Sequence, residues 1–197
     1  RDRDQAFAKF DGALLKYLLK MPLTKHMQNF HSKNVNLKWL NRSGYVLDLT
    51  FLNSADEQMW LNQARFIQEN LTDEVIENAF AQLPSTLQDE TSDDIIQKLK
   101  KRRNQLDKWA VQRYEFLQKQ VVLTGTDKKE RFEIIRKENG QTEISIFRIK
   151  KDGEELVHQR TYSKDLTNEI WIYGLDDNDI FEVKGISDKY IQIRLIG

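Results

Sequence analysis

The spacing of apolar residues changes near residue 125, and this change constrains the fold more than any other feature of the sequence. Before it, apolar side chains recur every three to four residues, as in "DEVIENAFAQL" (73–83). After it, they alternate with polar ones, as in "RFEIIRK" and "TEISIFRI". The first period belongs to helices and the second to strands. The sequence therefore predicts an α+β chain, with a helical subdomain over residues 1–124 and a β subdomain over residues 125–197.

Several helix start signals lie in the first part. Ser54 and Glu57 match a capping box, and Thr72 can cap the helix that follows. Ser92 precedes the longest apolar stripe, in "IIQKLKKRRNQLDKWAVQRYEFLQKQVV". This stripe predicts one helix of about 27 residues and about 40 Å, against which the shorter helices pack.

Turn signals divide the β part into six expected strands. Asn139-Gly140 is typical of a type I′ hairpin, because both residues tolerate positive φ, and Asp152-Gly153 marks a second turn. The first three strands are therefore expected to be antiparallel. Gly174, Gly185 and Gly197 punctuate the last three at nearly equal steps. This spacing favours a meander, and it also permits the first coils of a repeating β structure.

Composition excludes several classes of protein. The formal net charge is zero, with 31 basic and 31 acidic residues, so we expect no nucleic-acid partner. The basic run "KLKKRRNQ" is interpreted as the solvated face of the long helix. The absence of cysteine excludes disulfides and thiolate chemistry. No apolar run approaches the roughly 18 residues that span a bilayer, so we expect no membrane insertion by this segment.

Three acids in the link "GLDDND" (174–179) form the first candidate site. Asp176, Asp177 and Asp179 offer the hard oxygen ligands that Ca²⁺ prefers, and the stretch loosely matches the nonapeptide of calcium-binding β-rolls. Those sites need stacked copies, whereas this stretch occurs once. Asp and Asn are also typical of turns. The sequence therefore favours a turn, with a calcium site as the alternative.

Two further pairs of residues could bind ligands. Asp2 and Asp4 resemble the acids that hold magnesium and nucleotide in kinase-like folds, although no glycine-rich or catalytic loop accompanies them. Lys128 and Lys129, in "GTDKKE", could bind an anion, although a loop that turns the chain is favoured. No nucleophile elbow, P-loop, dinucleotide fingerprint or HExxH motif occurs, so no catalytic residue is assigned.

Several stretches, in order, resemble one family. They are "RDRDQAFAKFDG", "LTDEVIENAFAQLP", "IIQKLKKRRNQL" followed by "GTDKKERFEI", and "EIWIYGLDDNDIFEVKG". They are similar to a segment of large multidomain Gram-negative envelope proteins, in which a calcineurin-like metallophosphoesterase is fused to a surface-antigen-type outer-membrane β-barrel. The resemblance implies a location in the cell envelope, in the periplasm or outer membrane, and neighbouring domains of a longer parent chain as partners. The start at "RDRDQAF" likewise indicates an excised piece.

The resemblance does not carry over the phosphoesterase site. Its dinuclear metal centre needs D-x-H, G-D and G-N-H motifs, which this sequence lacks. We therefore expect a non-catalytic accessory or linking region. Two alternatives stay open. Asp2 and Asp4 could contribute metal-binding acids, with Mg²⁺, to a kinase-like or phosphoesterase site, or Asp176, Asp177 and Asp179 could make a calcium-dependent β module.

Overall fold

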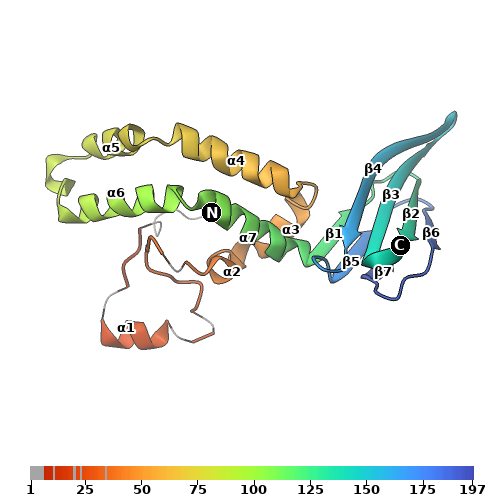
Figure 1. Cartoon of the computed structure of the whole chain (residues 1–197), viewed down its shortest axis with the longest axis horizontal. Coiled ribbons are helices and arrows are strands. Elements are labelled where there is room, and N and C mark those ends of the chain that lie inside the picture. The colour runs from red at the N-terminus through yellow and green to blue at the C-terminus, as the bar shows by residue number, and fades with distance from the viewer. Residues whose placement is uncertain (1–6, 11, 20, 23, 34) are drawn as a thin grey trace. The chain divides into compact units, whose positions relative to one another are not determined.

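The computed structural model describes residues 7–197 except 11, 20, 23 and 34. Helices come first along the chain and strands follow (Figure 1), so the chain belongs to the α+β class, as the change in apolar spacing predicts. The described residues divide into two compact units. The helical unit holds those up to Val46 together with Ala55–Tyr114, and the β unit holds Leu47–Ser54 together with Glu115–Gly197.

The β unit includes two segments that precede the change of spacing at residue 125, namely Leu47–Ser54 and the residues from Glu115 up to that change. Asn53 Nδ2 donates to the carbonyl oxygen of Val122 at 3.0 Å. Arg160 donates to the carbonyl oxygen of Asn53 at 3.0 Å and to Gln118 Oε1 at 3.2 Å. These bonds join the 47–54 segment and the end of the last helix to strands. Because they link residues far apart in the chain, a local period does not reveal them.

Short helices make up the helical unit (Figure 1). They are α1 (Ala13–Leu18), α2 (Leu37–Leu40), the 3₁₀ turn η1 (Arg42–Gly44), α4 (Glu57–Asn70), α5 (Asp73–Ala81), the 3₁₀ turn η2 (Ser85–Leu87) and α6 (Glu90–Arg103). Helices α3 (Tyr45–Phe51) and α7 (Leu106–Gln118) begin in this unit and end in the β unit.

The helix starts confirm one predicted cap and correct two. Thr72 Oγ1 accepts an amide of the first turn of α5 at 3.2 Å, as predicted. Helix α4 is capped by Asp56 rather than by Ser54, since the Asp56 carboxylate accepts an amide of its first turn at 2.7 Å. Asp89 caps α6, and Ser92 lies inside the helix as the other half of a reciprocal capping box.

The single long helix expected after Ser92 is wrong. The apolar stripe forms two helices, α6 and α7, which are separated at Asn104-Gln105. The Gln105 amide donates to the Arg102 carbonyl oxygen, three residues back, at 3.0 Å. The Gln105 side chain also donates to the carbonyl oxygens of Lys101 and Ser32, at 2.9 and 3.0 Å. Such side-chain bonds compete with the backbone hydrogen bonds of a helix. The spacing of apolar residues contains no information about them, so it did not predict the break.

The described residues of the β unit form two sheets, with strand orders β1-β5-β7 and β4-β3-β2-β6. The strands are β1 (Gln120–Thr124), β2 (Glu130–Arg136), β3 (Gln141–Lys150), β4 (Gly153–Ser163), β5 (Glu169–Tyr173), β6 (Ile180–Lys184) and β7 (Gln192–Ile196). The expected six strands omit β1, which the helical stripe assigns to the end of the long helix. Its run "VVLT" is rich in β-branched residues and suits a strand.

Both predicted turns join antiparallel strands, β2 to β3 and β3 to β4, as expected. Asn139 and Gly140 have positive φ, 58° and 73°, and Gly153, with φ 140°, starts β4. The first loop is longer than a type I′ turn, however. The Lys137 amide donates to the Gln141 carbonyl oxygen at 2.8 Å and closes a loop of three residues.

A repeated path connects the two sheets. Strand β1 leads through a short link to β2 in the other sheet, β5 leads through an equivalent link to β6, and β7 returns to the first sheet. Strand β1 pairs in parallel with β5, β5 with β7, and β2 with β6. We call β1–β2 the first coil, β5–β6 the second coil and β7 the start of the third. The β3–β4 hairpin is inserted between the first two coils.

The favoured meander is therefore wrong for the last strands. In a meander β6 would pair with both β5 and β7, whereas here β5 pairs with β7 and β6 pairs with β2. Aligned by their pairing, "QVVLTGTDKKERFEI" (120–134) matches "EIWIYGLDDNDIFEV" (169–183). One cluster of buried side chains joins both sheets. Within it, the rings of Phe132 and Phe181 stack between consecutive coils, with centroids 4.9 Å apart.

Candidate functional site

The link "GLDDND" connects β5 to β6 and ties the second coil to the first. Asp179 Oδ1 accepts a hydrogen bond from the Glu130 amide at 2.8 Å. Glu130, the equivalent residue of the first coil, accepts the amide and the hydroxyl of Thr126 at 2.8 and 2.9 Å. Bonds to carboxylates are the stronger kind. Both acids therefore fasten the backbone of the coils.

Two glycines allow these acids to approach the backbone. A Cβ on Gly125 would lie 2.5 Å from Glu130 Oε2 and 2.6 Å from the Gly174 carbonyl oxygen, and a Cβ on Gly174 would collide with Asp179 Oδ2. The amide of each glycine donates to a carbonyl of the next coil, at 2.7 Å for Gly125 and 2.8 Å for Gly174. We call each pair, Gly125 with Glu130 and Gly174 with Asp179, a glycine–acid joint.

The remaining residues of "GLDDND" have the geometry of a turn, the interpretation that the sequence favours. Leu175 and Asp177 have φ of 77° and 70°, in the left-handed region. Asp tolerates this region better than most residues. The Asp177 carboxylate also accepts the Asn178 amide at 2.7 Å. The turn is thus held by its own side chains.

Burial raises the pKa of Asp179, and the charges of Glu130 and Asp177 raise it further, against the lowering effect of the Glu130 amide. In the described part of the chain, no three His, Asp or Glu side chains form a group that could hold a metal ion. The calcium site at Asp176, Asp177 and Asp179 stays a prediction, as does the magnesium site at Asp2 and Asp4, which lie outside the described residues.

Lys128 and Lys129 lie in the equivalent link of the first coil, between β1 and β2, and both are exposed. The Lys129 carbonyl oxygen accepts the Ile149 amide at 2.9 Å, which fastens this link to β3. The structure therefore places both lysines on a turn at the surface. Anion binding by them stays a prediction.

A polar cavity of about 290 Å³ within the β unit is a site that sequence reasoning missed. Asn53, Glu130, Arg148 and His158 contribute to its lining. The Glu130 side chain is 1% exposed and lies 3.6 Å from the Arg148 guanidinium. Among the described residues, Asn53 Oδ1 and Arg148 Nε are buried without a hydrogen-bond partner. The sequence contains one indication that Glu130 is buried: it lies two residues before Phe132 in β2, and therefore on the same, buried face of the strand.

The histidine of this cavity is held towards its neutral form. Burial lowers the pKa of His158, and the positive charge of Arg160 lowers it further. Its Nε2 lies 3.4 Å from the Tyr162 hydroxyl. The cavity thus offers an imidazole and a guanidinium to a small polar molecule. Its acid, Glu130, already accepts bonds with both carboxylate oxygens.

The basic run is only partly a solvated helix face: Lys101 is exposed, as expected, whereas Lys100, Arg102 and Arg103 are partly buried, which corrects the expectation for these three. The side chains of Lys100 and Arg103 are each 14% exposed, and they pair with Asp73 of α5 at 3.2 and 2.8 Å. The Arg102 guanidinium lies 4.6 Å from the ring centroid of Phe30, and burial lowers its pKa. The ion pairs of Lys100 and Arg103 therefore connect α6 to α5, and Arg102 packs on Phe30.

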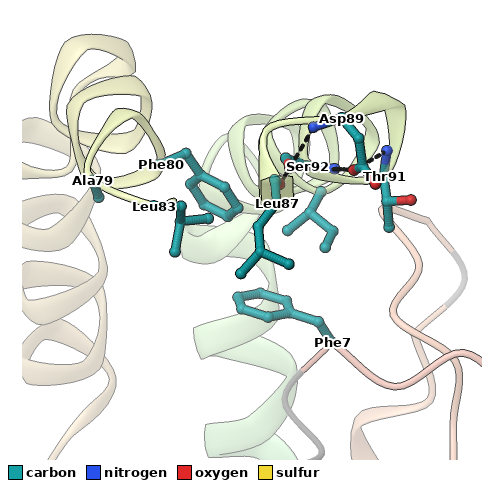
Figure 2. Close-up of a pocket in the computed structure, with 9 residues that line it drawn as sticks. Phe7, Ala79, Phe80, Leu83, Leu87, Asp89, Thr91 and Ser92 are labelled. Atoms are coloured by element: carbon teal, nitrogen blue, oxygen red, sulfur yellow. Dashed lines mark hydrogen bonds between the residues drawn. The ribbon is translucent and has the colours of Figure 1, made fainter. Parts of the chain in front are cut away.

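An apolar hollow of about 410 Å³ lies within the helical unit. Figure 2 shows Phe80 of α5 and Leu83 on one side of it, with Leu87 and Phe7 nearby. The ring centroids of Phe7 and Phe80 are 6.4 Å apart. The polar groups drawn around Asp89 belong to the capping box of α6. The hollow therefore presents mainly apolar side chains.

No helix among the described residues is both long and apolar enough to cross a membrane. Comparison of the chain with protein-family models, curated proteins and solved structures finds no match.

Proposed function

We propose that this chain is a non-catalytic accessory or linking region of a larger, multidomain phosphoesterase-like protein of the cell envelope. The observation that carries the proposal is that Glu130 and Asp179 accept hydrogen bonds from groups of the coils. Glu130 and Asp179 occupy equivalent positions of the two coils. Glu130 accepts the amide and the hydroxyl of Thr126 within its own coil, and Asp179 accepts the Glu130 amide of the neighbouring coil. Glu130 thus stabilises the link of its own coil and Asp179 bonds one coil to the next, and both are structural roles.

Stacked coils suit a linking role. In a stack, each repeat contacts mainly its neighbours. The number of coils then sets the distance between the domains that are attached at the two ends of the stack. The envelope location and the phosphoesterase-like parent belong to the proposal on the strength of the sequence resemblance. Neighbouring domains of the parent chain are the partners that this role requires.

Turnover assays test the non-catalytic part. We expect the purified chain to hydrolyse phosphomonoesters and phosphodiesters no faster than buffer does, with Mg²⁺, Mn²⁺ or Ca²⁺ present. Metal-dependent turnover that Asp4→Ala removes, while Asp152→Ala retains it, would refute the proposal. Asp152 is a suitable control because it is an exposed acid in the β3–β4 turn. That result would support a phosphotransfer or phosphoesterase site that includes Asp2 and Asp4.

A further inference from the structure

We propose that the polar cavity of the β unit binds a small uncharged polyol, a molecule of a few carbon atoms that carries several hydroxyl groups. The cavity lies within one compact unit, since the residues that line it belong to Leu47–Ser54 or to Glu115–Gly197. The inference goes beyond the linking role and does not depend on it, because its evidence is the lining of the cavity.

Two polar atoms of the lining residues have no hydrogen-bond partner among the described residues, and the two atoms need opposite partners. Asn53 Oδ1 can only accept a hydrogen bond, and Arg148 Nε can only donate one. Asn53 is 5% exposed, and its Nδ2 is already engaged, since it donates to the carbonyl oxygens of Leu49 and Val122. A buried polar atom without a partner destabilises a fold. A ligand that offers both a donor and an acceptor would satisfy both atoms.

The charges of the lining balance, and this balance selects an uncharged ligand. The Glu130 carboxylate lies 3.6 Å from the Arg148 guanidinium, so the two charges offset each other. The pKa of His158 is lowered by burial and by the charge of Arg160, so its imidazole is neutral at neutral pH. Arg160 itself lies outside the described lining, and its guanidinium donates to the Asn53 carbonyl oxygen. An anion would face the carboxylate and a cation would face the guanidinium, and burying an unpaired charge is costly.

Hydroxyl groups on a short carbon chain match the rest of the lining. A hydroxyl donates one hydrogen bond and accepts two, so one hydroxyl can accept from Arg148 Nε while another donates to Asn53 Oδ1. The neutral imidazole of His158 also offers one donor and one acceptor. Val122 and Ile146 add apolar surface, which suits the C–H groups of the chain. The volume of about 290 Å³ lies at the lower end of the range of about 300–1,000 Å³ for ligand pockets, so the ligand is small.

Three probes with the same carbon skeleton test the charge of the ligand. They are glycerol, which is uncharged, glycerate, which is an anion, and aminopropanediol, which is a cation at neutral pH. In an NMR titration of the full chain, we expect glycerol to shift the resonances of the Asn53 side-chain amide and the Arg148 Nε–H saturably. The Arg131 Nε–H should not shift, because it already donates to Glu154 at 3.0 Å. Glycerate and aminopropanediol should bind about tenfold more weakly or less, because each brings an unpaired charge.

Arg148→Met tests the donor. It should weaken glycerol binding about tenfold or more, because the ligand loses a hydrogen bond from a charged group. Arg131→Met is the matched control, since Arg131 follows Glu130 in β2 and therefore lies on the other face of the strand. Its guanidinium pairs with Glu154 at 2.7 Å. This variant should bind glycerol as the unchanged chain does.

Several results would overturn the inference. One is the absence of saturable shifts at the highest usable concentration of glycerol, because water alone would then satisfy the two atoms. Another is binding of glycerate, aminopropanediol or acetamide as tight as that of glycerol, because the ligand would then be charged or an amide. Both measurements use the unchanged chain, so they decide the matter even if Arg148→Met does not fold. Equal weakening by the two arginine substitutions would also refute the site. Turnover by the chain would refute the proposed function alone, and failure of glycerol to bind would refute this inference alone.

Discussion

Gly125→Ala tests the glycine–acid joint directly. Gly125 has no positive φ, so alanine meets no backbone strain, and the whole effect comes from the added methyl group. That methyl would lie 2.5 Å from Glu130 Oε2, 2.6 Å from the Gly174 carbonyl oxygen and 3.0 Å from Phe132 Cζ. The carbonyl belongs to the backbone of the second coil, which cannot rotate away as the end of a side chain can. Relief therefore requires the two coils to move apart.

The magnitude follows from overpacking. Inserting a methyl group into a packed core destabilises a fold by about 1–3 kcal/mol, and contact with backbone places this substitution near the upper value. A loss of about 3 kcal/mol corresponds to about a hundredfold change in an equilibrium constant. We therefore expect the most protected amides of β5 to exchange about a hundredfold faster in Gly125→Ala. Amide exchange is the suitable assay because it reports on the β unit separately from the helical unit.

Gly197→Ala is the matched control. Gly197 holds the equivalent position after β7, and a Cβ there would meet nothing within 4 Å. This variant should leave the exchange of β5 unchanged. Similar exchange rates in Gly125→Ala and Gly197→Ala would show that the close approach of the coils does not require glycine, and the reasoning about the joints would fail.

Three further predictions concern single groups. Thr72→Ala should destabilise the helical unit by about 1 kcal/mol in urea unfolding, because α5 loses its cap, while Thr72→Ser should retain stability. The pKa of His158 is lowered from 6.5 on folding, so the unfolded chain binds its proton first as pH falls. The stability of the β unit should therefore drop as pH falls below about 7, and His158→Gln should flatten this slope. The thermal midpoint should be the same in calcium and in chelator, because Asp179 Oδ1 is already engaged by the Glu130 amide; a rise with calcium that Asp176→Asn removes would contradict this.

The candidate site was predictable only in its local features. The composition of "GLDDND" indicated a turn, and the left-handed conformations of Leu175 and Asp177 agree with it. The partner of Asp179 was not predictable, because Glu130 lies on another strand and meets it only when the coils stack. The polar cavity was not predictable for the same reason, since Asn53 is far from β1 in the sequence and meets it only in the folded chain.

The sequence by itself determined the α+β class, the order of helices before strands, the cap at Thr72 and the two hairpin turns. These features depend on neighbouring residues, whose period and turn chemistry act locally. The tertiary structure alone decided the parallel pairing of β1, β5 and β7 and the break between α6 and α7. An apolar period shows which face of a strand is buried, but it does not show which strand will cover it. That choice depends on register between distant segments, and here the glycine–acid joints help to fix it.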